Sequence, residues 1–128
     1  MGLSWRAALR WAAALGGLGV LLGAFGAHAL KDSLAPEMLA VWHTAVLYQF
    51  LHALALLGTG LALQRSPDCR AWRRAGAAFV LGCLLFSGSL YLLAVSGWRW
   101  LGAITPLGGL SFLLGWFWLW RGISPPRY

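Results

Sequence analysis

The chain of 128 residues is 60% hydrophobic and only 10% charged, with a mean hydropathy of +0.71. A soluble domain of this length could not bury so much apolar surface, whereas a lipid bilayer covers the outside of a membrane domain. The formal net charge of +7 does not indicate a nucleic-acid-binding protein, because the basic residues stand at the ends of apolar segments and not in one run. These features predict a single membrane domain over residues 1–128.

Four apolar segments are long enough to cross a bilayer as helices, which takes about 20 residues each. The fold class predicted from them is all-α, a polytopic membrane protein built as a bundle of four transmembrane helices. The expected helices are 7–30, 38–63, 75–96 and 100–120. Pro36 fits the first turn of the second helix, and Thr105-Pro106 either bends the fourth helix or starts its regular part.

The first segment carries small residues along one face. Gly16, Gly19, Gly23 and Gly26 are spaced by 3, 4 and 3 residues, which places them within an arc of about 80° on a helix. Small residues let a second helix approach closely, which is a main way of packing helices in lipid. The four glycines are therefore predicted to form a helix-packing face.

The same segment also has features of a secretory signal peptide. It has a basic start, an apolar run and the sequence Ala27-His28-Ala29 near its end. The apolar run exceeds the roughly 7–15 residues of a signal peptide, and this favours a membrane-spanning helix.

The basic residues are unequally divided between the two ends of the predicted bundle. Lys31 and Arg99 fall at one end, against eight arginines at the other. Because cytoplasmic loops are enriched in Lys and Arg, this division predicts that both termini are cytoplasmic. The eight arginines are Arg6, Arg10, Arg65, Arg70, Arg73, Arg74, Arg121 and Arg127.

The second segment carries polar residues near its middle. Thr44, Tyr48 and His52 follow one another at steps of four along one helical face, and Gln49 lies at the flank of this stripe. Polar groups at this depth are costly unless other helices pair with them. We expect His52 to be uncharged, donating a hydrogen bond through one ring nitrogen and accepting one through the other. Its expected partners are Tyr48, Gln49, Ser87 and Tyr91.

Further polar residues fall in the outer halves of the other segments. If their side chains converge with the stripe, they form a buried polar cluster that is open to the outer face. This cluster could bind a ligand or serve only as a hydrogen-bond network. Its candidate residues are His28, Thr44, Tyr48, Gln49, His52, Ser87, Ser89, Tyr91 and Thr105.

Four stretches of the chain resemble the signatures of a known family. They are Gly23–Leu30, Trp42–Leu54, Phe86–Tyr91 and Ile104–Gly109. In these stretches the chain is similar to the family catalogued as domain of unknown function 423, which includes bacterial YgdD-like inner-membrane proteins and eukaryotic transmembrane protein 256. The resemblance implies a multi-pass protein of four helices, located in bacteria in the plasma membrane. It implies no reaction.

The residues offer little support for a metal site or for catalysis. His43 and His52 would lie on opposite faces of one helix, about 13 Å apart along its axis, so they cannot bind the same ion. Pairing of His28 with either of them across helices stays possible. A hydrolase built on Ser87 and His52 would lack an acid to orient the histidine. We predict no catalytic residue, no metal and no cofactor.

The predicted function is therefore that of a non-enzymatic plasma-membrane protein, a binding or accessory component that forms a homo-oligomer or joins a larger membrane complex. One alternative is a small-solute or proton-linked transporter that uses His52 and Gln49. Such transporters normally keep a carboxylate within the membrane, and here no acid lies within the predicted spans. Another alternative is a redox accessory protein that binds haem or quinone through His28 and a partner.

Overall fold

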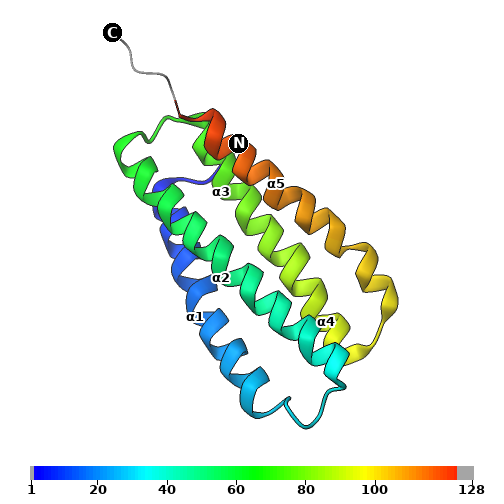
Figure 1. The fold of residues 1–128 in the computed structure, drawn as a ribbon. Coiled ribbons are helices and arrows are strands. Elements are labelled where there is room, and N and C mark those ends of the chain that lie inside the picture. The colour runs from blue at the N-terminus through cyan, green and yellow to red at the C-terminus, as the bar shows by residue number, and fades with distance from the viewer. Residues whose placement is uncertain (1, 124–128) are drawn as a thin grey trace.

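The computed structural model of the protein describes residues 2–123, and most of them are helical (Figure 1). Arg127 of the charge analysis lies outside this range. The first two spans are α1 and α2, the third is built from α3, η1 and α4, and the fourth from η2 and α5. Each of the four spans is long and apolar enough to cross a membrane. The bounds are α1 Trp5–His28, α2 Pro36–Arg65, α3 Arg70–Gly82, η1 Cys83–Ser87, α4 Gly88–Ser96, η2 Arg99–Ala103 and α5 Thr105–Arg121.

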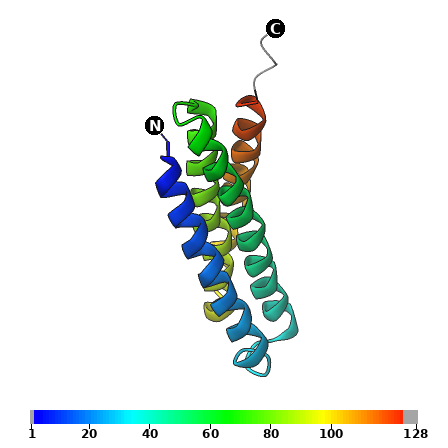
Figure 2. The same ribbon diagram turned by 90° about the vertical axis from the view of Figure 1, so that its left-hand side faces the viewer.

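The spans lie side by side and alternate in direction. In Figure 1, α1 and α5 form the two edges, and α2 and the α3–α4 rod lie between them. Figure 2, turned by 90°, shows the start of α1, the connection between α2 and α3, and the end of α5 at the same end of the bundle. Among the described residues, this end carries every arginine except Arg99, so the charge asymmetry seen in the sequence is a property of the folded molecule.

The third span begins at Arg70, earlier than the predicted start at residue 75. The arginine-rich stretch is helical because two of its residues are tied to other spans. The indole N–H of Trp72 donates to the carbonyl oxygen of Leu119 in α5 at 3.0 Å. The backbone N–H of Leu3 donates to the carbonyl oxygen of Arg73, also at 3.0 Å.

The core of the bundle is built from residues of all four spans. Phe79, which is fully buried, packs among residues of α2 and α5, and Gly115 makes room for its ring. A Cβ added at Gly115 would lie 2.6 Å from Cδ1 of Phe79. Many leucines point outward instead, as expected for a surface covered by lipid. The buried core residues are Ala8, Ala12, Leu15, Ala53, Leu56, Ala75, Phe79, Val80, Cys83 and Phe112.

Glycines of α1 lie at its contact with α2. A Cβ added at Gly26 would overlap the indole of Trp42, whose N–H donates to the carbonyl oxygen of Leu22 at 2.9 Å. At Gly19 an added Cβ would lie 3.0 Å from the ring of Phe50. At these positions the glycines make room for the aromatic side chains of α2, so no space is left for a side chain on α1. Gly23, with an added Cβ 3.4 Å from Val46, belongs to the same contact.

Candidate functional site

His52 is buried near the middle of α2, and both of its ring nitrogens have a partner. Nδ1 lies 2.8 Å from the carbonyl oxygen of Tyr48, and the indole N–H of Trp116 in α5 donates to Nε2 at 3.1 Å. Because a carbonyl can only accept and an indole N–H can only donate, the ring is neutral with its proton on Nδ1. This is the donor–acceptor pattern predicted for His52. Trp116, however, was not among its predicted partners.

Aromatic rings surround the imidazole of His52. Its ring stacks on Phe112, with centroids 3.5 Å apart and an interplanar angle of 10°. Tyr48 stacks at 6.0 Å and 13° on the same helix, and Phe79 packs at 5.8 Å. The histidine therefore joins α2 to α5 through stacking as well as through hydrogen bonding.

Gln49 points away from His52 and joins three spans. Its Nε2 donates to the carbonyl oxygen of Leu15 in α1 at 2.8 Å, and its Oε1 accepts from the hydroxyl of Tyr91 in α4 at 2.7 Å. The ring of Tyr91 also packs on Trp42, with centroids 4.6 Å apart. Gln49 is only 2% exposed, so this side chain is fully used in holding the bundle together.

The serines of the third span make two further links. The hydroxyl of Ser87 donates to the carbonyl oxygen of Ala45 in α2 at 2.7 Å. Ser89 lies 2.7 Å from the hydroxyl of Thr105 at the start of α5, and it also donates to the carbonyl oxygen of Phe86. The hydrogen bonds from Ser87 to Ala45 and between Ser89 and Thr105 run between spans, and all three satisfy polar groups that lipid could not.

The remaining candidates lie apart from these links. His28 is exposed at the end of α1, and Thr44 is exposed on α2 with its hydroxyl bonded to the carbonyl oxygen of Ala40. Six of the nine candidates make separate hydrogen-bonded links between spans and do not form one cluster open to the outer face. These six are Gln49, His52, Ser87, Ser89, Tyr91 and Thr105. Among residues 2–123, no group of three His, Cys, Asp or Glu side chains lies close enough together to hold a metal ion.

The third span is interrupted by the π-helix η1. The backbone N–H of Gly88 bonds to the carbonyl oxygen of Cys83, five residues earlier, which marks one residue more in this turn than an α-helix holds. On one side of η1, Ser87 bonds to α2. On the other side, Gly108 of α5 lies against the backbone of Phe86, where an added Cβ would overlap backbone atoms. Such bulges often occur at functional sites.

A groove of about 550 Å³ opens toward lipid between α2 and α5, beside η1. Tyr48 is 37% exposed there, and its hydroxyl has no hydrogen-bond partner within the described part of the chain. Leu110 and Leu113 form an exposed rim. We call this the α2–α5 groove. Its lining residues are Tyr48, His52, Phe86, Pro106, Gly109, Leu110, Phe112, Leu113 and Trp116.

Sequence reasoning missed the contribution of α5 to this site. Neither Trp116 nor Phe112 was among the candidate residues that the sequence indicated. A signal was present, because Phe112 and Trp116 are four residues apart and share a helical face, as Tyr48 and His52 do on α2. Two aromatic stripes of the same spacing can stack against each other.

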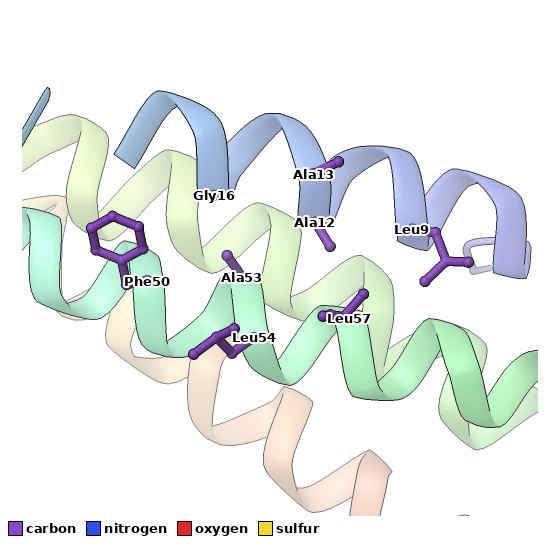
Figure 3. Close-up of a pocket in the computed structure, with 8 residues that line it drawn as sticks. All are labelled: Leu9, Ala12, Ala13, Gly16, Phe50, Ala53, Leu54 and Leu57. Carbon is purple, nitrogen blue, oxygen red and sulfur yellow. The ribbon is translucent and has the colours of Figure 1, made fainter. Parts of the chain in front are cut away.

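A second groove, of about 280 Å³, lies between α1 and α2 (Figure 3). Gly16 lines this groove, and no atom lies within 4 Å of a Cβ added there, so Gly16 is not part of the close contact that Gly19 and Gly26 make. All of its lining side chains are apolar, which offers nothing to orient a polar ligand. The lining residues are Leu9, Ala12, Ala13, Gly16, Phe50, Ala53, Leu54 and Leu57.

When the chain is compared with known protein families, one family model matches its sequence. The model of the family described as "Protein of unknown function (DUF423)" matches residues 22–109. The chain belongs to the DUF423 family. The matched range includes Tyr48, His52 and Phe86 of the α2–α5 groove, whereas Phe112 and Trp116 lie beyond it.

Curated relatives in the DUF423 family are membrane proteins. The chain is 44% identical over 99 residues to the UPF0382 membrane protein YwdK of Bacillus subtilis, covering 77% of this chain and 80% of the relative. It is 44% identical over 109 residues to the UPF0382 inner membrane protein YgdD of Escherichia coli, covering 84% and 82%. No solved structure matches the chain. With its four apolar spans, this DUF423 protein is a multi-pass protein of the bacterial plasma membrane.

Proposed function

We propose that this protein is a non-enzymatic binding or accessory component of a membrane assembly, and that the α2–α5 groove binds a molecule drawn from the bilayer. The observation that carries the proposal is the free hydroxyl of Tyr48 at the groove. A hydroxyl in hydrocarbon without a hydrogen-bond partner is costly. A bound molecule with an oxygen acceptor would supply that partner.

The depth of Tyr48 follows from the length of α2. With 30 residues from Pro36 to Arg65, α2 is about 45 Å long and exceeds the hydrocarbon core of about 30 Å. Tyr48 lies two residues from the midpoint of the helix, near residue 50, so its side chain lies well inside the hydrocarbon. Water is not a ready partner at this depth.

The hydrogen bonds around the groove favour binding over catalysis and over transport. His52 has both nitrogens engaged, so it is not free to take a proton from a substrate. The hydroxyl of Ser87 donates to a backbone carbonyl and is not activated by a neighbouring base. Gln49 is engaged through both its amide nitrogen and its amide oxygen in interhelical hydrogen bonds. These polar side chains hold the spans in place.

The proposal includes the orientation and the association of the protein. Seven arginines of the described residues lie at the end of the bundle where α1 starts and α5 ends, and they support a cytoplasmic location for that end. Association with itself or with a larger membrane complex would use a lipid-facing surface. The exposed side of α1, where Ala13, Gly17 and Ala24 are small, leaves room for a close approach of another helix.

Photo-crosslinking in intact membranes tests the binding role of the groove. A benzophenone amino acid at Leu113, on the rim of the groove, should capture a molecule that the same probe at Leu114 does not capture. Both positions are exposed on α5, but only Leu113 lines the groove. The adduct, identified by mass spectrometry, should disappear in Gly109→Leu, which projects a side chain into the groove. The same set of bulk phospholipid adducts at both positions would refute the proposal.

Gly58→Leu serves as the matched control for Gly109→Leu. Gly58 is exposed in α2, and nothing lies within 4 Å of a Cβ added there. An added Cβ at Gly109 lies 3.9 Å from Phe86, which is ordinary contact, so both variants are expected to fold. Loss of the adduct in Gly58→Leu as well would show that it does not depend on the groove.

A further inference from the structure

We infer that the molecule bound in the α2–α5 groove is a lipid-soluble quinone, an uncharged planar ring that carries carbonyl oxygens and an apolar tail. This inference rests on the proposed binding function and names the chemical class of the ligand. Four properties of the groove support it: the absence of charge among its lining residues, its depth in the bilayer, its aromatic walls, and its size and opening.

The lining of the groove excludes a charged head group. No lining residue is acidic or basic, and His52 is neutral with both nitrogens engaged. A charged group entering the groove would lose its hydration without gaining a counter-charge. The ligand must therefore bring its acceptor oxygen on an uncharged group.

The depth of Tyr48 excludes the ester carbonyls of ordinary phospholipids. These groups lie in the interfacial layer, outside the hydrocarbon core of about 30 Å. Tyr48 lies instead two residues from the midpoint of α2, away from both interfaces. A carbonyl able to reach it must belong to a molecule whose ring is itself soluble in hydrocarbon. Quinone rings with long apolar tails meet this condition.

Aromatic side chains favour a flat ring over a flexible acyl chain. The rings of Tyr48, His52 and Phe112 stack nearly parallel, with interplanar angles of 13° between Tyr48 and His52 and 10° between His52 and Phe112. Phe86 packs against Tyr48 with centroids 4.6 Å apart, at the floor beside η1. Stacking and edge contacts with aromatic rings stabilise planar π-systems beyond simple burial of area.

The size and opening of the groove suit a ring with a tail. Its volume of about 550 Å³ lies within the usual range for small-molecule sites, about 300–1,000 Å³. Leu110 and Leu113 at the rim are 56% and 67% exposed, so an apolar tail can leave the groove directly into lipid. In this arrangement the hydroxyl of Tyr48 donates to one carbonyl of the ring.

Binding of decylubiquinone to the full-length protein in lipid nanodiscs tests the inference. Quenching of tryptophan fluorescence should contain a saturable component, because Trp116 borders the groove. Tyr48→Phe removes only the hydroxyl and should weaken saturable binding about three- to tenfold. Gly109→Leu should abolish saturable binding, and Gly58→Leu should leave it unchanged.

A competitor with the same tail separates recognition of the ring carbonyls from simple hydrophobic filling. Decylbenzene has a planar ring and the same apolar chain but no carbonyl, so it should compete weakly with decylubiquinone. If decylbenzene competes equally well, or if Tyr48→Phe binds as tightly as the wild type, the quinone inference is wrong. A specific crosslink at Leu113 would in that case still support the proposed binding function. Absence of both the crosslink and saturable quenching would refute both proposals.

Discussion

The hydroxyl of Tyr91 donates to Oε1 of Gln49 across 2.7 Å. The amide nitrogen of the same Gln49 donates to the carbonyl oxygen of Leu15 at 2.8 Å, so one side chain joins α1, α2 and α4. Interhelical hydrogen bonds in membranes average only about 0.6 kcal/mol each, because the separated helices also find partners. A buried group left without any partner is more costly, about 1–3 kcal/mol.

Gln49→Leu should therefore lower the free energy of unfolding by about 1–3 kcal/mol, since it leaves the Tyr91 hydroxyl without its acceptor. Reversible unfolding in mixed micelles measures the change. Thr44→Val is the control, because Thr44 is exposed and bonds only within its own helix. Equal losses in the two variants would show that the link across the helices contributes nothing.

Substitutions of His52 separate its hydrogen bonding from its packing. His52→Gln should stay within about 1 kcal/mol of the wild type, because the amide can donate to Tyr48 and accept from Trp116. His52→Leu leaves the indole N–H of Trp116 unpaired and should destabilise the protein by about 1–3 kcal/mol. The indole resonance of Trp116 in nuclear magnetic resonance spectra should move in His52→Leu. An unmoved resonance would contradict the contact.

Gly26 should tolerate substitution less well than Gly17. Gly26→Leu forces a side chain into the indole of Trp42 and should separate α1 from α2 near the α1–α2 connection. Gly17→Leu places the same side chain where no atom lies within 4 Å. Thermal unfolding in nanodiscs should show a large loss of stability for the first variant and a small change for the second. Equal stability would mean that Gly26 is not a close contact.

Gly108 and Gly109, neighbours at the start of α5, should differ in how strongly their substitution destabilises the protein. Gly108→Ala adds a methyl group against backbone atoms of Phe86, which cannot rotate away, and should be strongly destabilising. Gly109→Ala meets Phe86 only at 3.9 Å and should be close to neutral. Thermal unfolding of both proteins checks this difference. A stable Gly108→Ala variant would show that α5 packs less closely on η1 than described.

The orientation can be tested by cysteine labelling in intact cells. In a background that lacks Cys69, Ser33→Cys and Trp98→Cys should react with an impermeant reagent added from outside. Ser66→Cys, at the arginine-rich end, should react only after the membrane is opened. Labelling of Ser66→Cys from outside would reverse the orientation. Ser124, a further site for such a test, lies outside the described residues.

Much of the fold could be predicted, because membrane spans depend on local length and composition. The stripe on α2 was less predictable. Four residues advance a helix by about 40° beyond a full turn, so Thr44 and His52 differ by about 80° around α2. The stripe therefore winds from lipid at Thr44 to the interior at His52, with Tyr48 in between. Which part faces inward depends on the rotation of the helix, and periodicity alone does not fix it.

The pairing of His52 with Trp116 could not be predicted for a related reason. Contacts between distant spans depend on their relative rotation and height. Within η1 one turn holds an additional residue, and this changes the directions in which the side chains that follow point around the helix axis. A regular helix extrapolated from the arginine-rich end would turn Ser87, Ser89 and Tyr91 about 100° away from the directions in which they lie.

The π-helix also gives the third span a fixed phase relation between its two ends. The half at the arginine-rich end, α3, is set by contacts with α5, and the other half, α4, is set by the hydrogen bond between Tyr91 and Gln49. Removing one residue between Cys83 and Ser87 would leave the composition and hydropathy of the span almost unchanged. Because the π-turn takes up one additional residue, this deletion would close the span into a regular α-helix and keep the two halves in phase. A second deletion would have no such turn to take it up, and it would rotate α4 by about 100° relative to α3.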